Sequence, residues 1–286
     1  MHNKIKILGL FFSIILSSEH PEKITEQETV RQKDAIVLID MPSIIDKKSV
    51  QDAVDVLWQL EKDETALGLI LLVNCSGGAA GSSYHLFSVI SEIAKKKPVV
   101  AFVENYALSG GYLMVTAADY IIATPVSTVG SVGVISSIHK LSDVHFRNEN
   151  TSAAETVHVI SAGDYKADTS PYTQLEKRAI VYQHAISQAI YKEFYSIVAK
   201  ARNIDADSHE IWANGKEFST RVALELNLID QIGSLTDAIL KVESMLTKRG
   251  LNNADLDIRY ELRLVKTCDD SKANKVCLDQ KMYLQY

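Results

Sequence analysis

The feature that most constrains this 286-residue chain is an alternation of short apolar runs with segments of helical period between residues 35 and 123. The run at residues 66–73, ALGLILLV, is almost entirely apolar, as a strand covered on both faces should be. Strands that alternate with helices indicate βαβ units, a mostly parallel sheet and an α/β fold. The other expected strands lie at residues 35–41, 98–103 and 120–123, and the expected helices at residues 50–60, 84–93 and 110–118.

Composition supports a folded domain and excludes several other classes of protein. Apolar residues make up 47% of the chain and charged residues 23%, which excludes disorder, collagen-like repeats and a polytopic membrane protein. A formal net charge of -6 excludes a globally basic nucleic-acid binder, though not a local basic patch. Three cysteines are too few for a dense disulfide framework, so the core must provide the stability.

The N-terminus resembles a secretory signal. Lys4 and Lys6 precede an apolar run at residues 7–16, shorter than the about 20 residues that a straight membrane-spanning helix needs. Ile15 and Leu16 stand where a cleavage site requires a small residue. A cleaved signal, a retained short anchor and a buried N-terminal helix of a cytosolic protein therefore all stay open. If the segment is a targeting signal, the rest of the chain is exported.

The composition changes again after residue 250. Residues 256–265, LDIRYELRLV, alternate apolar and polar side chains, which predicts a half-buried strand. For Cys268 and Cys277, a disulfide and two reduced surface thiols both stay open, whereas Cys75 in an apolar stretch is expected to be buried and inert. The expected organisation is a signal or short anchor at 1–18, a linker at 19–34, a main domain at 35–250 and a C-terminal extension at 251–286.

The longest expected helix lies at residues 174–203. Its apolar residues recur at helical spacing, and the preferred interpretation is that they pack in the core. His184 lies within this helix and is expected to be solvated or packed rather than catalytic. The apolar stripe consists of Leu175, Ala179, Tyr182, Ile186, Ile190 and Phe194.

Two Ser-Gly-Gly segments, at residues 76–78 and 109–111, follow expected strands at the sheet edge where ligand sites of parallel sheets lie. A serine at a strand-to-helix junction exposes its hydroxyl beside the free N–H groups of a helix N-terminus. Glycines let another backbone approach closely. Two such loops can supply both halves of an oxyanion hole, although Gly-Gly at a strand end is more often a tight turn.

A serine nucleophile needs a base. The chain has no GxSxG nucleophile elbow, and none of its histidines lies in a recognisable catalytic setting. A lysine replaces histidine as the base when burial lowers its pKa toward neutrality, and the candidate is Lys166 in SAGDYKADTSPY. The chain has no HExxH motif, no clustered Cys/His spacing and no P-loop, so no metal and no cofactor are expected.

Four segments between residues 68 and 234 resemble, in order, the signal peptide peptidase A (protease IV) family of Ser/Lys peptidases. LLVNCSGGAAGSS is similar to the first glycine loop, and ALSGGYLMVTAADYIIATPVSTVGSVGVI to the nucleophile segment. GDYKADTSPYT is similar to the lysine segment, and NGKEFSTRVALELNLIDQIGS to a segment near the end of the catalytic domain. The resemblance implies a Clp-protease/crotonase-like α/β fold, with a parallel sheet of repeated ββα/βαβ units flanked by helices. The chain length is near that of the single-domain members.

The resemblance also implies a role for each candidate site residue. The main domain, residues 35–250, is then a Ser/Lys peptidase domain. The implied oxyanion hole comes from backbone N–H groups, which are fixed donors for a developing negative charge. Ser109 matches the nucleophile, Lys166 the general base, Ser131 the serine that orients the lysine, and Gly110 and the Gly77–Gly78 loop the oxyanion hole.

The implied function is that of a serine endopeptidase that degrades cleaved signal peptides or other short apolar membrane-associated peptides. The implied partners are peptide substrates and further copies of the chain, in a membrane-facing ring whose sites take serine and lysine from adjacent subunits. No nucleic acid is expected to bind. The implied location is the inner membrane, with the catalytic domain exported to the periplasmic or extracytoplasmic side. Activity is expected to rise with pH until Lys166 is neutral.

Three other functions stay open. The first is a phage-type member of the same family that processes capsid proteins, which localisation would distinguish. The second is a crotonase-like acyl-CoA enzyme on the same fold, which a CoA-binding assay would reveal. The third is a non-catalytic membrane-associated scaffold, which a peptidase assay on assembled rings would separate from an enzyme.

Overall fold

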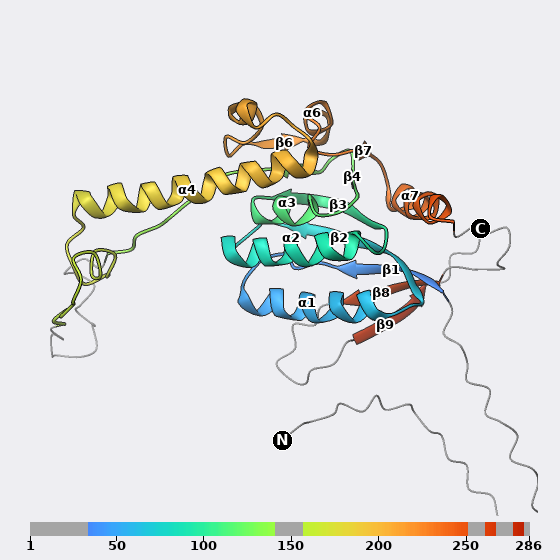
Figure 1. Cartoon of the computed structure of the whole chain (residues 1–286), viewed down its shortest axis with the longest axis horizontal. Coiled ribbons are helices and arrows are strands. Elements are labelled where there is room, and N and C mark those ends of the chain that lie inside the picture. The colour runs from blue at the N-terminus through green and yellow to red at the C-terminus, as the bar shows by residue number, and fades with distance from the viewer. Residues whose placement is uncertain (1–33, 141–156, 251–260, 267–276, 283–286) are drawn as a thin grey trace, which may run out of the picture. The chain divides into compact units, whose positions relative to one another are not determined.

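The computed structural model of the protein describes residues 34–140, 157–250, 261–266 and 277–282, and for the last two segments the backbone alone (Figure 1). The predicted signal or anchor and Cys268 lie outside these residues. Among the helices of the described segments, none combines the length and apolar character that crossing a bilayer requires.

The described residues form one sheet of nine strands. The strands are β1 (Ala35–Asp40), β2 (Ala66–Cys75), β3 (Val99–Leu108), β4 (Tyr120–Ala123), β5 (Thr128–Gly130), β6 (Glu217–Ser219), β7 (Gln231–Ile232), β8 (Glu261–Lys266) and β9 (Cys277–Met282). Their order is β6-β5-β3-β2-β1-β8-β9, and β4 pairs with both β3 and β7. Only β5 with β6 and β8 with β9 pair antiparallel, so the predicted, mostly parallel sheet is confirmed.

Helices flank this sheet on both faces, which confirms the predicted α/β class. The helices are α1 (Lys47–Lys62), α2 (Ala80–Ala94), α3 (Gly110–Val115), α4 (Lys177–Arg202), the 3₁₀ turn η2 (Ala206–Ser208), α5 (His209–Trp212), α6 (Thr220–Glu225) and α7 (Leu235–Lys248). Side chains of α1, α2 and α3 join the larger hydrophobic core, and those of α7 join a second core. The strands contribute alternate residues to the two cores, as strand geometry requires.

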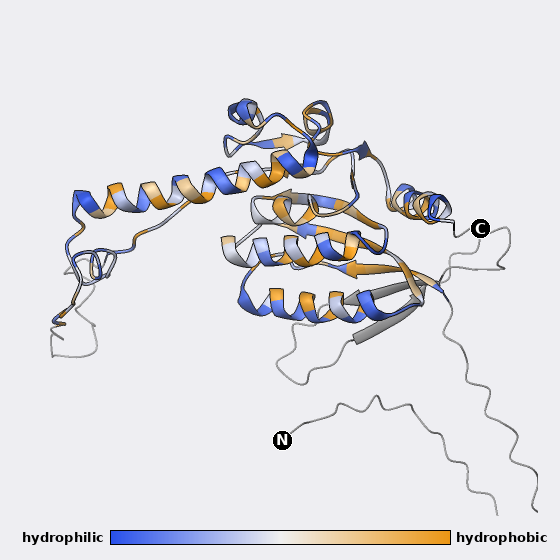
Figure 2. Ribbon diagram, in the orientation of Figure 1, coloured by the Kyte–Doolittle hydropathy of each residue, from blue (hydrophilic) through white to orange (hydrophobic). Residues whose placement is uncertain are grey.

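The strand β2 illustrates why the central strands have no polar alternation. Leu69 and Leu71 belong to the larger core, whereas Ile70 between them belongs to the core under α7. Because successive side chains point to opposite faces and both faces are covered, every position must be apolar. Figure 2 shows hydrophobic residues along the strands and a mixture of hydrophobic and hydrophilic residues along α1.

Two flanking helices begin with side-chain caps that the local sequence supplies. The carboxylate of Asp46 accepts a 2.8 Å hydrogen bond from the backbone N–H of Ser49 at the start of α1. Ser234 and Asp237 form the corresponding capping box at the start of α7. Such boxes satisfy N–H groups that have no partner within the helix, so these two helix starts are locally encoded.

The core-packing interpretation of the longest helix is wrong for most of the stripe before Phe194, although Ala179 in the first turn is buried. Phe194 is buried in the larger core, but the side chains of Tyr182 and Ile190 are 51% and 37% exposed. Leu175, which precedes the helix, is 36% exposed. The reason is that only the C-terminal part of α4 reaches the core, while its first half extends past the sheet (Figure 1). Helical periodicity alone does not say what covers an apolar stripe.

The segment after residue 250 adds two strands to the same sheet. Strand β8 pairs parallel with β1, and β9 pairs antiparallel with β8. The expected strand at residues 256–265 lies partly outside the described residues and overlaps β8. Cys277 is the first residue of β9, and because Cys268 is outside the described part, a disulfide between them stays a prediction.

Candidate active site

Ser109 lies at the junction between β3 and α3 in a backbone conformation that is rare for any residue other than glycine. Its φ is 51° and its ψ is -123°. Its N–H donates a 2.8 Å hydrogen bond to the carbonyl oxygen of Gly130, and its own carbonyl accepts one of 3.0 Å from Leu113. The half-buried side chain makes no capping hydrogen bond to α3. A strained conformation held by its surroundings in this way is a hallmark of functional sites.

The first glycine loop packs directly against this serine. A Cβ atom built on Gly77 would lie 2.9 Å from the backbone nitrogen of Gly110 and 2.9 Å from the Cβ atom of Ser109. Gly77 has a φ of 100°, which also favours glycine. A Cβ atom on Gly110 would in turn lie 3.5 Å from the backbone nitrogen of Gly78. The structure therefore brings both predicted glycine segments together beside Ser109.

The loop after β1 holds the glycine loop in place. The N–H of Ile45 donates a 2.8 Å hydrogen bond to the carbonyl of Gly77, and the carbonyl of Ile45 accepts one of 2.9 Å from Ala79. A Cβ atom on Gly78 would collide with the Ile45 carbonyl. Sequence reasoning missed Ile45, which carries no motif; only the pairing of the two backbones reveals its role.

Ser83 is a second residue that the sequence motifs did not single out. Its side chain is 1% exposed, and its hydroxyl donates a 3.0 Å hydrogen bond to the carbonyl of Ala79. A Cβ atom on Gly110 would collide with the Ser83 hydroxyl. This buried serine thus separates α2 from the N-terminus of α3 and sets how closely the two glycine segments approach.

Ser131 lies at the next strand end. Its predecessor Gly130 pairs with Leu108 and accepts the hydrogen bond from Ser109. The two serines therefore follow the ends of two neighbouring strands, β3 and β5. Ser131 has a φ of 52° and donates a 2.7 Å hydrogen bond from its N–H to the carbonyl of Lys216. The two serines predicted to act together are therefore anchored in one network of backbone hydrogen bonds.

Lys166 does not lie in this cluster. Its side chain is exposed, in the loop that precedes α4, and its N–H donates a 3.0 Å hydrogen bond to Gly163. The neighbouring Tyr165 ring lies 5.3 Å from the ring of Tyr182 on the exposed half of α4. From Tyr182 the helix runs about 18 Å, at about 1.5 Å per residue, before Phe194 enters the core that also contains α3. Within one chain, the structure does not bring Lys166 to Ser109.

Cys75, at the end of β2, is buried, as the sequence predicts. A Cβ atom on Gly111 would lie 2.9 Å from its sulfur atom, so α3 packs directly on β2 at this point. Burial raises the pKa of the Cys75 thiol, and the neighbouring Gly77 N–H opposes the shift only in part. Among the described residues, no group of three or more His, Cys, Asp or Glu side chains is arranged to hold a metal ion.

The fold and this site define a class of protein: a Clp-protease-like α/β protein with a strained serine and a glycine loop at adjoining strand ends. The model described as peptidase family S49 matches residues 91–248, more than half of the chain. The chain therefore belongs to peptidase family S49, the family of signal peptide peptidase A, which confirms the predicted family. The matched range includes Ser109, Ser131 and Lys166, whereas Gly77 and Gly78 precede it.

Individual relatives agree with this assignment. A protein of Methanocaldococcus jannaschii, provisionally named a protease, is 34% identical over 199 residues, which are 70% of this chain and 62% of that protein. SppA of Enterococcus faecium, provisionally named a signal peptide peptidase, is 32% identical over 67% of this chain and 55% of its own length. Protease 4 of Haemophilus influenzae is 29% identical over 78% of this chain and 36% of its own length. The chain thus spans less than two thirds of each of these relatives.

Proposed function

We propose that the protein is a serine endopeptidase with Ser109 as its nucleophile and Lys166 as its general base. The observation that carries the proposal is the conformation of Ser109, which holds a hydroxyl at the N-terminus of α3 against a glycine loop. The N–H groups there are suited to a developing negative charge. Membership of a peptidase family supports the same reaction class.

In the proposed reaction, neutral Lys166 takes the proton from the Ser109 hydroxyl, whose oxygen attacks the carbonyl carbon of a peptide bond. Backbone N–H groups of Gly110 and the Gly77–Gly78 loop stabilise the oxyanion. The protonated lysine then gives its proton to the leaving amine, and an acyl-enzyme forms. Water, activated by the same lysine, hydrolyses the acyl-enzyme and regenerates the serine. Ser131 orients the lysine.

The complete site is proposed to form between two copies of the chain. Lys166 is exposed and separated from Ser109 along α4, so an adjacent copy is needed to supply one of the two. The exposed side chains of Tyr182 and Ile190 on α4 offer apolar area for such a contact. A closed ring satisfies the requirement for every copy, because each then gives a serine to one neighbour and a lysine to the other.

The proposed substrates are cleaved signal peptides or other short apolar membrane-associated peptides. The name of the Enterococcus faecium relative supports this substrate class. The N-terminal basic and apolar segment supports a matching location, with the domain exported and held at the membrane. Protease accessibility of the tagged domain in intact cells and in opened cells tests the location, since only an exported domain is digested from outside.

Mixing of two inactive variants tests the enzyme and its shared site together. Ser109→Ala and Lys166→Ala proteins are assembled alone or co-assembled, and cleavage of an apolar signal-peptide mixture is followed by mass spectrometry. Each variant alone is expected to be inactive, whereas mixed assemblies regain activity at interfaces that join an intact serine to an intact lysine. Cleavage that survives Ser109→Ala in pure assemblies would contradict the serine mechanism. Mixed assemblies that stay inactive, with mixing verified by native mass spectrometry, would contradict the shared site.

A further inference from the structure

We propose that Arg178 is a positioning residue, which fixes the loop that carries Lys166 so that the lysine side chain is presented away from its own chain. This inference rests on the proposed function, in which Lys166 is the general base. It assigns a specific task to a residue on the first turn of α4 that touches neither the serine nor the glycine loop.

Arg178 contacts the lysine loop on both sides of Lys166. Its terminal nitrogen Nη2 donates a 2.8 Å hydrogen bond to the carbonyl of Asp164 and a 2.9 Å hydrogen bond to Oδ1 of Asp168. Its guanidinium carbon also lies 5.2 Å from the centre of the Tyr165 ring. The fixed, planar shape of a guanidinium suits this combination of ring stacking and two acceptors better than an ammonium does.

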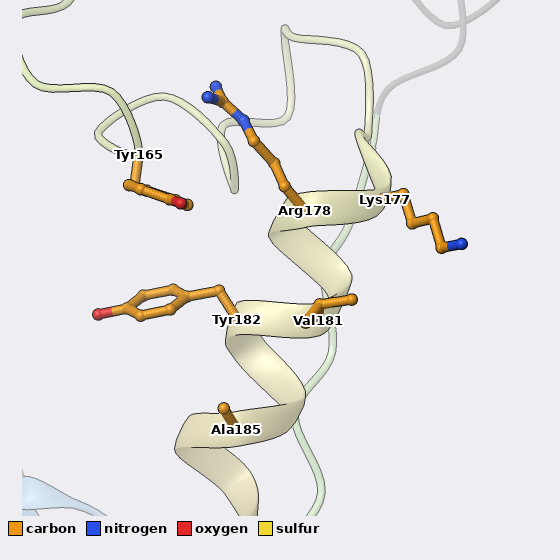
Figure 3. A pocket seen from close by; sticks show the side chains of 6 residues that line it. All are labelled: Tyr165, Lys177, Arg178, Val181, Tyr182 and Ala185. Atoms are coloured by element: carbon orange, nitrogen blue, oxygen red, sulfur yellow. The ribbon is translucent and has the colours of Figure 1, made fainter.

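Figure 3 shows the arrangement around the start of α4. Tyr165, Arg178 and Tyr182 lie on one side, with the loop over the helix, whereas Lys177 points to the other side. The rings of Tyr165 and Tyr182 are 5.3 Å apart. The loop is therefore held against the helix by a ring pair and a cation together, and Lys177 offers a neighbouring cation outside this cluster.

A second cation secures the following turn of the loop. The ammonium of Lys140 donates hydrogen bonds of 2.9 Å to the carbonyl of Asp168 and 2.6 Å to that of Ser170. It also lies 3.3 Å from the hydroxyl of Thr173, which itself donates a 2.7 Å hydrogen bond to the carbonyl of Ala167. The loop is thus bound to Arg178 on both sides of Lys166 and to Lys140 on its C-terminal side only.

The burial of Asp168 shows how much the loop depends on Arg178. The Asp168 side chain is 10% exposed, and its Oδ2 atom has no hydrogen-bond partner among the described residues. A nearly buried carboxylate is costly unless a cation accompanies it, and Arg178 is its ion-pair partner. Without the guanidinium, Asp168 is expected to turn toward water and carry the loop with it.

The backbone of Lys166 is consequently fixed while its side chain stays exposed. Reaching a serine on a second copy then requires ordering one side chain and not a whole loop. Holding reacting groups in position lowers the entropic part of the barrier, and a displacement of about 1 Å can cost about 100-fold in rate. Loss of Arg178 is therefore expected to lower kcat without weakening substrate binding.

The test compares Arg178→Met with Lys177→Met in the full assembled protein, using a peptide that wild-type protein cleaves in a Ser109-dependent manner. Arg178→Met is expected to lower kcat about 10- to 100-fold with an unchanged KM, whereas Lys177→Met keeps wild-type values. Arg178→Lys is expected to retain a higher kcat than Arg178→Met. Its ammonium can still pair with the Asp168 carboxylate, although it does not reproduce the other contacts of the guanidinium. Free guanidinium at millimolar concentration is expected to raise kcat of Arg178→Ala, because it can replace the group that this truncation removes. The same addition is expected to leave Lys166→Ala inactive.

The outcomes separate this inference from the proposed function. A kcat for Arg178→Met equal to that of Lys177→Met, while Lys166→Ala is inactive, overturns the positioning role alone. A loss that matches a loss of assembled protein by analytical ultracentrifugation, without rescue by guanidinium, also overturns it, since the role would then be structural. Undiminished activity of Lys166→Ala overturns the proposed base, and the positioning role with it.

Discussion

The backbone N–H of Ser109 donates a 2.8 Å hydrogen bond to the carbonyl oxygen of Gly130, and so joins the end of β3 to the residue that precedes Ser131. The backbone N–H of Ser131 in turn donates a hydrogen bond to the carbonyl oxygen of Lys216, next to β6. The two serines of the candidate site are therefore held by the sheet itself. Their relative position depends on strand pairing more than on either local loop.

Gly110→Ala is expected to lower kcat about 100-fold, the order found when one oxyanion donor is lost. The new Cβ atom would collide with the Ser83 hydroxyl and lie 2.9 Å from the Ser83 Cβ atom, which moves the Gly110 N–H. Steady-state kinetics on the assembled protein measures the effect. Ser83→Ala combined with Gly110→Ala should recover part of the activity, because it removes the first of these collisions.

Gly81→Ala is the matched control for that change, since a Cβ atom on this α2 residue meets nothing within 4 Å. It should leave kcat unchanged and slightly raise stability, because alanine favours helix by up to about 1 kcal/mol over glycine. Equal kcat for Gly110→Ala and Gly81→Ala would contradict the proposed oxyanion role of Gly110.

Arg202→Met is expected to lower the free energy of unfolding by about 3 kcal/mol. Arg202 is 9% exposed and forms two hydrogen bonds, of 3.0 and 2.8 Å, with the Asp230 carboxylate. That carboxylate also accepts from the N–H of Ile121 beside the sheet, so it is left without its cation in the variant. Urea unfolding at fixed protein concentration measures the change.

Two further variants serve as controls for the Arg202 measurement. Lys200→Met on the exposed side of α4 should cost less than about 0.5 kcal/mol. Adding Asp230→Asn to Arg202→Met should recover part of the loss, because the unpaired charge is gone. A double variant no more stable than Arg202→Met would show that the ion pair is not the source of the effect.

Tyr112→Phe is expected to change how stability depends on alkaline pH. The buried phenol donates a 2.7 Å hydrogen bond to the carbonyl of Leu228, and burial raises its pKa above the usual value of about 10. The folded state therefore binds this proton more tightly than the unfolded state does. The contribution of the protonated phenol to the free energy of unfolding is complete below about pH 10 and is lost as pH rises above that value.

The variant lacks the hydrogen bond and should be about 1–3 kcal/mol less stable near neutral pH. The difference from wild type should narrow above about pH 10, because phenylalanine has no proton to lose. Urea unfolding at several pH values measures both curves. Parallel curves across the alkaline range would be inconsistent with a titrating Tyr112.

Cys75 is expected to resist alkylation in the folded protein. Its side chain is buried and burial raises the pKa of the thiol, so little thiolate is accessible to a reagent. Reaction with iodoacetamide should be at least about 100-fold slower than in urea, where local opening no longer limits access. Peptide mass mapping follows Cys75 separately from Cys268 and Cys277. Equal rates in both conditions would contradict the observed burial.

The sequence alone determined the fold class and marked the segments that form the candidate site. A run such as residues 66–73 can be apolar throughout only if both faces of its strand are covered, so a parallel sheet with helices on each side followed directly. The glycines after β2 and β3 marked the sheet edge where a site belongs. These are short-range signals, because period and turn chemistry involve residues close together in the chain.

Only the tertiary structure decided which of these segments meet. The contact of Gly77 with Gly110, the buried Ser83 between them and the hydrogen bond from Ser109 to Gly130 join residues distant in sequence. Such contacts depend on strand order and register, which local patterns do not encode.

The exposed half of α4 and the separation of Lys166 from Ser109 have the same origin. An apolar stripe predicts that one face of a helix is to be covered, but not by what. Tyr182 on this half is exposed, whereas Phe194 three turns later is buried, although both belong to one periodic pattern. The difference is set by how far the hydrophobic core that contains α3 extends along the helix, which is a property of the folded chain and not of the helical sequence.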